Sequence, residues 1–111
     1  MKAIKIDPKN MQVKEIDLPE KEGEIDLSCL RKEIECNHFD VVRLPNGDVI
    51  FVDDEGLLVE KPAGFAISSY NQTLMGNGVV IGTGSMGESQ PPASSVQEIE
   101  ELIVGWAFSA S

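Results

Sequence analysis

Aromatic residues, cysteine and histidine are scarce in this sequence. Only 5% of the 111 residues are aromatic, and the chain has two cysteines and one histidine. The core therefore has to be built from Ile, Val, Leu and Met. A site of the Cys and His type needs more ligands than this, so we expect no bound metal. No apolar run reaches the length that crosses a bilayer, and we expect no membrane contact.

Lys and Arg are absent from residues 62–111 of the chain. The sequence has 9 basic and 19 acidic residues, a net charge of -10, and no Lys or Arg follows Lys61. Direct electrostatic binding to DNA, RNA or anionic lipid is not expected, because each needs a basic footprint. Residues 1–8 alternate apolar residues with lysines and do not read as a signal peptide, so we expect a cytoplasmic protein.

The most regular feature of the sequence is a series of short strands separated by turn residues. Alternating apolar residues predict a strand at 2–6, and a run rich in β-formers predicts another at 11–18; we expect the two to form a hairpin. A Pro-Asn-Gly turn between two β-rich runs predicts a second hairpin over 39–52, since Asn and Gly both tolerate a positive φ. The continuous apolar run 79–81 predicts a strand that is buried on both faces.

The first helix signal follows a charged connection. Asp26 or Ser28 can cap a helix that runs to about Glu35 with one apolar face. Cys29 and Cys36 are seven residues apart there, too far along a helix for a disulfide, and we expect two reduced thiols.

The second half holds one clear helix signal and two less regular segments. Ser95 and Glu98 form a capping box, which opens a closing helix whose apolar face extends to Trp106. Residues 65–74 are ambiguous, with apolar pairs that suit a short helix. Residues 82–93 are rich in Gly, Ser and Pro and predict a flexible loop.

Together these elements predict one α+β domain over residues 1–111. Hairpins dominate and strands do not alternate regularly with helices, which favours a small, mostly antiparallel sheet. We expect the two helices to pack on it, on one face. A short strand or extended piece is also expected at 57–59.

No motif in the sequence predicts catalysis or a cofactor. Residues 82–87 match the glycine pattern of dinucleotide-binding loops, but Pro91 and Pro92 preclude the helix that this pattern requires. Residues 53–55 lack the alternating ligands of a calcium loop. His38 lies near Cys36 without a third group to orient it. We therefore expect a protein that is not an enzyme and has no cofactor.

Several short motifs appear in an order that resembles one known family. They are residues 1–8, 41–47, 52–57, Asn71 and 76–82. In this order they resemble the DUF3846 family of bacteriophages and plasmids, a domain of unknown function, over roughly residues 1–84. The resemblance implies a protein of a phage, prophage or conjugative element, and it supplies no catalytic residues to carry over.

Candidate binding residues follow from the scarcity of cations and from these motifs. Arg43 stands mid-strand on the face opposite Val42 and Leu44, where it can anchor an anion or carboxylate if another element or subunit covers that face. Otherwise it is an ordinary exposed residue. The set of candidates is Arg43, Asp53, Asp54, Glu55, Lys61, Asn71, Asn77 and Gly78.

Two functions from different classes fit these observations. The first is stoichiometric inhibition of a host defence protein with a basic surface, such as a CRISPR nuclease, because an acidic protein can occupy a basic nucleic-acid channel. The second is a sponge for a nucleotide-derived immune signal, such as a cyclic dinucleotide or cyclic ADP-ribose, with Arg43, Lys61 and the amides at 76–78 as donors. A structural accessory with another partner is the third reading. The 39–52 hairpin also offers an edge that a second copy can cover in a homo-oligomer.

Overall fold

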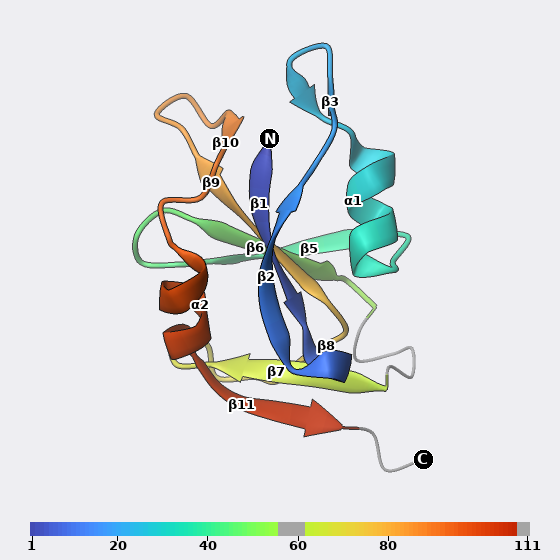
Figure 1. The fold of residues 1–111 in the computed structure, drawn as a ribbon, viewed down its shortest axis with the longest axis vertical. Helices are drawn as coiled ribbons and strands as arrows, with labels where there is room; N and C mark the ends of the chain where they lie inside the picture. The colour runs from blue at the N-terminus through green and yellow to red at the C-terminus, as the bar shows by residue number, and fades with distance from the viewer. Residues whose placement is uncertain (56–61, 109–111) are drawn as a thin grey trace.

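An antiparallel sheet runs through the middle of the computed structural model, which describes residues 1–55 and 62–108 (Figure 1). Its strands are Lys2–Asp7 (β1), Gln12–Asp17 (β2), Phe39–Arg43 (β5), Val49–Asp53 (β6), Gly78–Thr83 (β9) and Ser89–Gln90 (β10). The order is β2-β1-β9-β6-β5, and β10 pairs with β9. With two helices packed on this sheet, the predicted α+β class is confirmed.

Both predicted hairpins are present, and each is held by its turn. The β1–β2 register runs from Lys2 opposite Asp17 to Asp7 opposite Gln12. A single 3-10 turn, η1 (Pro8–Asn10), joins the strands. In the β5–β6 hairpin only Gly47 takes a positive φ, 93°, because the loop is a three-residue turn that ends in a left-handed glycine. Asn46 therefore does not use the tolerance that the sequence suggested.

The central strand β9 is buried on both faces, as its apolar run predicts. Val80 packs with one core cluster, whereas Val79 and Ile81 pack with the other. Successive side chains in a strand point to opposite faces of the sheet, which separates Val80 from its two neighbours. Ile50 of β6, directly opposite Val80, belongs to the first cluster as well. The sheet therefore separates two hydrophobic cores, and both depend on β9.

A second sheet covers the first core. It has the order β11-β7-β8, with strands Ala63–Ile67 (β7), Leu74–Met75 (β8) and Ile103–Phe108 (β11). Phe65 and Ile67 of β7 are buried in the first core. The expectation of a short helix within 65–74 is wrong, because pairing with β11 and β8 and burial of the apolar side chains outweigh a weak local preference.

The closing helix, α2 (Val96–Leu102), is shorter than the sequence predicts. Its capping box is present: the Ser95 hydroxyl accepts from the Glu98 amide, and the Glu98 carboxylate accepts from the Ser95 amide. The helix ends before Ile103, and Trp106 lies on β11 instead of on the helix. The predicted extension is wrong because residues 103–108 pair with β7.

The other helix, α1 (Leu27–Ile34), covers the second core with Leu30 and Ile34. Ile99 of α2 belongs to the first core, so the two helices lie on opposite sides of the sheet (Figure 1). The expectation that both helices share one face is therefore wrong. No disulfide joins Cys29 and Cys36, as expected.

Residues 82–93 are only partly a loop. Strand β9 continues to Thr83, the chain turns over Gly84–Gly87, and β10 pairs back with β9. The Glu88 carboxylate accepts from the Met86 amide at 2.9 Å within this turn. Residues 82–83 and 89–90 are therefore strand instead of loop, and the flexibility of the segment stays a prediction. Met86 is 91% exposed at the tip.

A buried carboxylate ties the entry of α2 to the β5–β6 turn. Asp48 is 2% exposed, and its two carboxylate oxygens accept from the amides of Ala93 and Ser94, each at 2.9 Å. Asn46 adds a bond of 2.7 Å to the Ser94 hydroxyl. We call these four residues the Asp48 clasp.

The strand expected at 57–59 lies outside the described residues. Among the helices that the structure describes, none has both the length and the apolar character required to cross a bilayer.

Candidate functional site

Arg43 lies at the end of the edge strand β5, where its side chain is exposed. Val42 and Leu44 on either side of it are buried, as the alternation predicts. The same edge carries a protective contact: the Asp40 carboxylate accepts from the Val41 amide at 2.8 Å. A strand that paired with β5 through this amide would have to displace that bond.

The acidic turn at 53–55 follows β6. The Asp53 carboxylate accepts from the Glu55 amide at 2.9 Å. Asp53 and Asp54 line a pocket of about 70 Å³ together with Asp40 and Tyr70. Asn71 is exposed directly after Tyr70, so the structure brings these predicted residues into one neighbourhood. Within residues 1–55 and 62–108, no group of His, Cys, Asp and Glu is placed to hold a metal ion.

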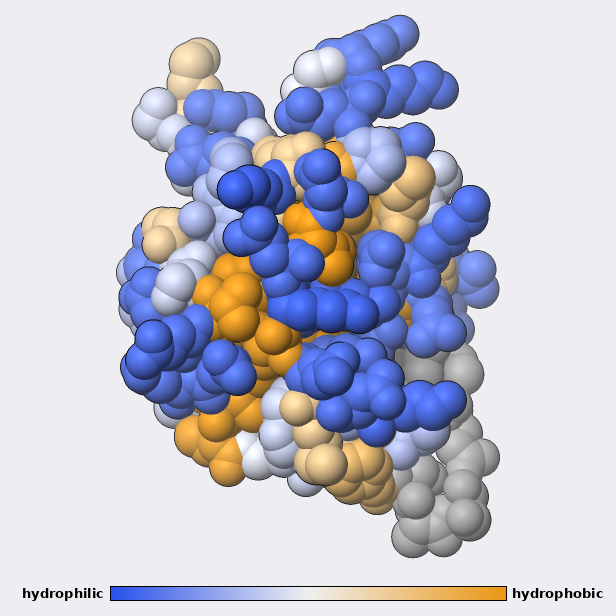
Figure 2. Space-filling model, in the orientation of Figure 1, coloured by the Kyte–Doolittle hydropathy of each residue, from blue (hydrophilic) through white to orange (hydrophobic). Residues whose placement is uncertain are grey.

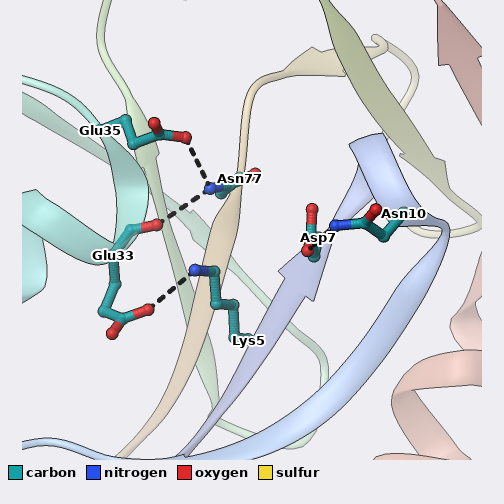
Figure 3. Close-up of polar contacts among 6 residues, drawn as sticks. All are labelled: Lys5, Asp7, Asn10, Glu33, Glu35 and Asn77. Atoms are coloured by element: carbon teal, nitrogen blue, oxygen red, sulfur yellow. Dashed lines mark hydrogen bonds and ion pairs between the residues drawn. The ribbon is translucent and has the colours of Figure 1, made fainter.

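Asn77 is engaged inside the molecule. Its side-chain amide donates to the Glu33 carbonyl at 3.0 Å and to the Glu35 carboxylate at 3.2 Å (Figure 3). Lys5 of β1 adds an ion pair to the Glu33 carboxylate at 2.8 Å. These contacts connect the C-terminal end of α1 to the sheet, which gives Asn77 a structural role.

Gly78 begins β9 and is buried against the first core. A Cβ atom at this position would lie 2.9 Å from Cζ of Phe65 and 3.0 Å from Cγ2 of Ile50. Both distances are shorter than normal packing allows, so the position requires glycine for close approach. Lys61, the remaining candidate, lies outside the described residues.

The described candidates for anion binding do not converge. The pairings place Arg43 opposite Val49 and Val49 opposite Ile81. Asn77 is four residues along the chain from Ile81, which corresponds to roughly 13 Å of strand. Arg43 and Asn77 therefore lie toward different ends of the sheet and form no common pocket.

A larger groove lies elsewhere, between two arms of the molecule. One arm is a two-stranded ribbon, β3 (Glu20–Lys21) and β4 (Glu24–Ile25), and the other is the β9–β10 hairpin. In Figure 1 these arms stand at the top, and Figure 2 shows the notch between them. The groove encloses about 630 Å³. Sequence reasoning treated residues 19–24 as a plain connection and missed it.

Backbone geometry shapes the ribbon arm. Glu22 and Gly23 form its tip with φ values of 56° and 80°, the conformation of a tight hairpin turn. At its base the Asp26 amide donates to the Pro19 carbonyl at 2.9 Å. The Asp26 carboxylate caps α1 by accepting from the Ser28 hydroxyl at 2.6 Å and the Ser28 amide at 3.0 Å. These bonds lower the pKa of Asp26 below its ordinary value.

The lining of the groove divides into an acidic rim and an apolar floor. The floor is formed by Met1, Ile25, Leu30 and Phe51, which belong to the second core cluster or pack against it. The rim carries one cationic side chain, Lys21, and five carboxylates, those of Glu20, Glu22, Glu24, Asp26 and Glu88. We call this site the acidic groove. It combines apolar contact area with a strong negative potential.

Three rim carboxylates are available to a partner. Glu20, Glu22 and Glu24 are exposed, and within the part of the chain that the structure describes their side chains make no hydrogen bond or ion pair. Asp26 and Glu88 instead hold the two arms in shape through the bonds to Ser28 and Met86. The sequence signal for the site is the cluster of glutamates around a Glu-Gly turn, which is unusual for a mere connection.

The family model for the domain of unknown function DUF3846 matches residues 1–103. The chain belongs to this family. The match confirms the resemblance and extends it beyond residue 84, through the β10 hairpin and all of α2, which the sequence motifs had left outside. No curated protein and no solved structure matches the chain.

Proposed function

We propose that this protein is a non-enzymatic binding protein that inhibits a host defence system, using the acidic groove to occupy a basic surface of its target. A CRISPR nuclease is a suitable target, because its nucleic-acid channel is lined by cations. The observation that carries the proposal is the rim of five carboxylates and one cationic side chain above an apolar floor. Such a protein would act in the cytoplasm of the host bacterial cell.

Two features of the groove, its charge and its apolar floor, favour such an encounter. Its three unengaged glutamates stand on a projecting ribbon, where a basic partner meets them first. Electrostatic steering of this kind raises association rate constants by one to three orders of magnitude and falls steeply with ionic strength. The apolar floor then supplies contact area that does not depend on salt.

Sequestration of a nucleotide signal has less support in the described part of the chain. It needs several anion donors around one cavity, and the structure separates Arg43 from Asn77, whose amide is already bonded to α1. The acidic groove would repel a phosphate. We therefore favour a basic protein over a nucleotide as the ligand.

The test is binding to purified CRISPR nucleases, measured by calorimetry and by association kinetics at several salt concentrations. We expect a one-to-one complex whose association rate constant falls about ten-fold when Glu22→Gln and Glu24→Gln are combined. The matched control combines Glu100→Gln and Glu101→Gln on α2, which removes the same charge away from the groove. Equal effects of the two double variants, or binding that is insensitive to salt, would refute the proposal.

A further inference from the structure

The pairing of β3 with β4 determines which side chains of the ribbon point to the same face, and this limits the kind of ligand that the groove can bind. Glu20 lies directly opposite Ile25, and Lys21 lies opposite Glu24. Residues directly opposite in an antiparallel pair point to the same face, with Cβ atoms roughly 5 Å apart. A carboxylate of the rim and an apolar side chain of the floor are thus presented side by side.

Exposed apolar surface continues along the groove at the start of α1. Leu27 lines the groove and is 52% exposed, although it is an apolar residue beside a row of carboxylates. It lies two residues beyond Ile25, on the side where α1 meets the ribbon. The groove therefore offers apolar contact both on its floor and at its border, flanked by negative charge.

We infer that the acidic groove binds an extended protein segment in which Lys or Arg residues stand two positions from an apolar side chain. In an extended chain residues i and i+2 point to the same side and are roughly 6.6 Å apart. That spacing allows a cation to meet Glu20 or Glu22 while the apolar side chain lies against Ile25 and Leu27. The inference rests on the proposed function and deepens it by naming the recognised segment.

Three synthetic peptides test this spacing with the full-length protein. The first contains Arg-Ser-Leu-Ser-Arg, the second replaces Leu with Ser, and the third replaces both Arg residues with Gln. Fluorescence anisotropy at low salt should show the first binding about ten-fold tighter than the second, the effect of one buried leucine. The third should lose both its affinity and its salt dependence. Equal affinity for the first two peptides, or no binding of the first, overturns the inference.

Two protein variants locate the binding. Leu27→Ser should abolish the preference for the first peptide over the second, whereas the combined Glu20→Gln and Glu22→Gln should weaken both peptides and flatten their salt dependence. The matched control is Val104→Ser, which removes an apolar side chain that is 66% exposed on β11, away from the groove. If Leu27→Ser and Val104→Ser behave alike, the inference is wrong.

The experiments distinguish a failure of this inference from a failure of the proposed function. If the protein binds the first two peptides equally, but its complex with the nuclease still weakens in the Glu22→Gln and Glu24→Gln double variant, the inference about the segment is wrong and the proposed function stands. If the protein prefers the first peptide as expected but forms no complex with a nuclease, the inference about the segment stands and the nuclease is not the target.

Discussion

Two turns of this molecule, the β5–β6 turn and the tip of the β3–β4 ribbon, resemble each other in sequence and differ in how they are held. Each pairs a polar residue with glycine, Asn46-Gly47 in one and Glu22-Gly23 in the other. The first is fixed by the Asp48 clasp, while the second ends in exposed glutamates that make no side-chain bond to the described residues. The polar residues of the first serve stability, whereas those of the second make no such bonds and are the ones to which we assign recognition in the proposed function.

The largest loss of stability is expected when the Asp48 clasp is removed. Replacing Asp48 with Ala leaves the part-buried amide of Ala93 and the buried amide of Ser94 without an acceptor, so we expect the free energy of unfolding to fall by about 3 kcal/mol. Urea denaturation followed by circular dichroism measures it. Asp54→Ala, at an exposed position, should stay within about 0.5 kcal/mol of the parent protein. Similar losses in both variants would contradict a structural role for the clasp.

Crowding at Gly78 should have the next largest effect. A methyl group there would press on Phe65 and Ile50, so Gly78→Ala should lower the unfolding free energy by about 2 kcal/mol. Gly105→Ala is the matched control, because no atom lies within 4 Å of its added Cβ and its φ is not positive. A loss of stability in the control that equals the loss at Gly78 would show that the added side chain, not the close approach, is responsible.

The smallest effect is expected at the base of the ribbon, where Asp26 caps α1. Bonds from Ser28 hold the pKa of Asp26 below its ordinary value, so Asp26 stabilises the fold above the unfolded pKa, and this contribution is lost as the pH falls through the folded pKa. Asn at this position caps equally well but does not titrate. The stability of the parent protein relative to Asp26→Asn should therefore be constant near neutral pH and decline in the acidic range where aspartates protonate, as measured by thermal unfolding. A constant difference from neutral pH down to pH 2 would rule out this linkage.

Local signals explain which parts of the fold were predictable. The two hairpins, the Asp26 cap and the Ser95 capping box rest on a few adjacent residues, and all four are present. The end of α2 was misjudged because the partner of residues 103–108 is β7, some forty residues earlier in the chain. No local pattern reports a pairing over that distance.

The acidic groove escaped prediction for the same reason. Its walls come from residues 20–30 and 87–89, which meet only when both arms have folded. Asn77 and Gly78 were singled out as candidate binding residues, and the contacts that the structure gives them serve packing and the end of α1. That they also contact a ligand stays a prediction, as does self-association through β5.

The hydrogen bond from the Val41 amide to Asp40 bears on how this protein behaves at high concentration. An open sheet border invites other chains to add to it, and growth of that kind ends in fibres or precipitate. By satisfying an amide of its own border strand, the molecule withholds one attachment point that an incoming chain would need. We therefore expect the Asp40 carboxylate to disfavour the addition of further copies along this border in a crowded solution.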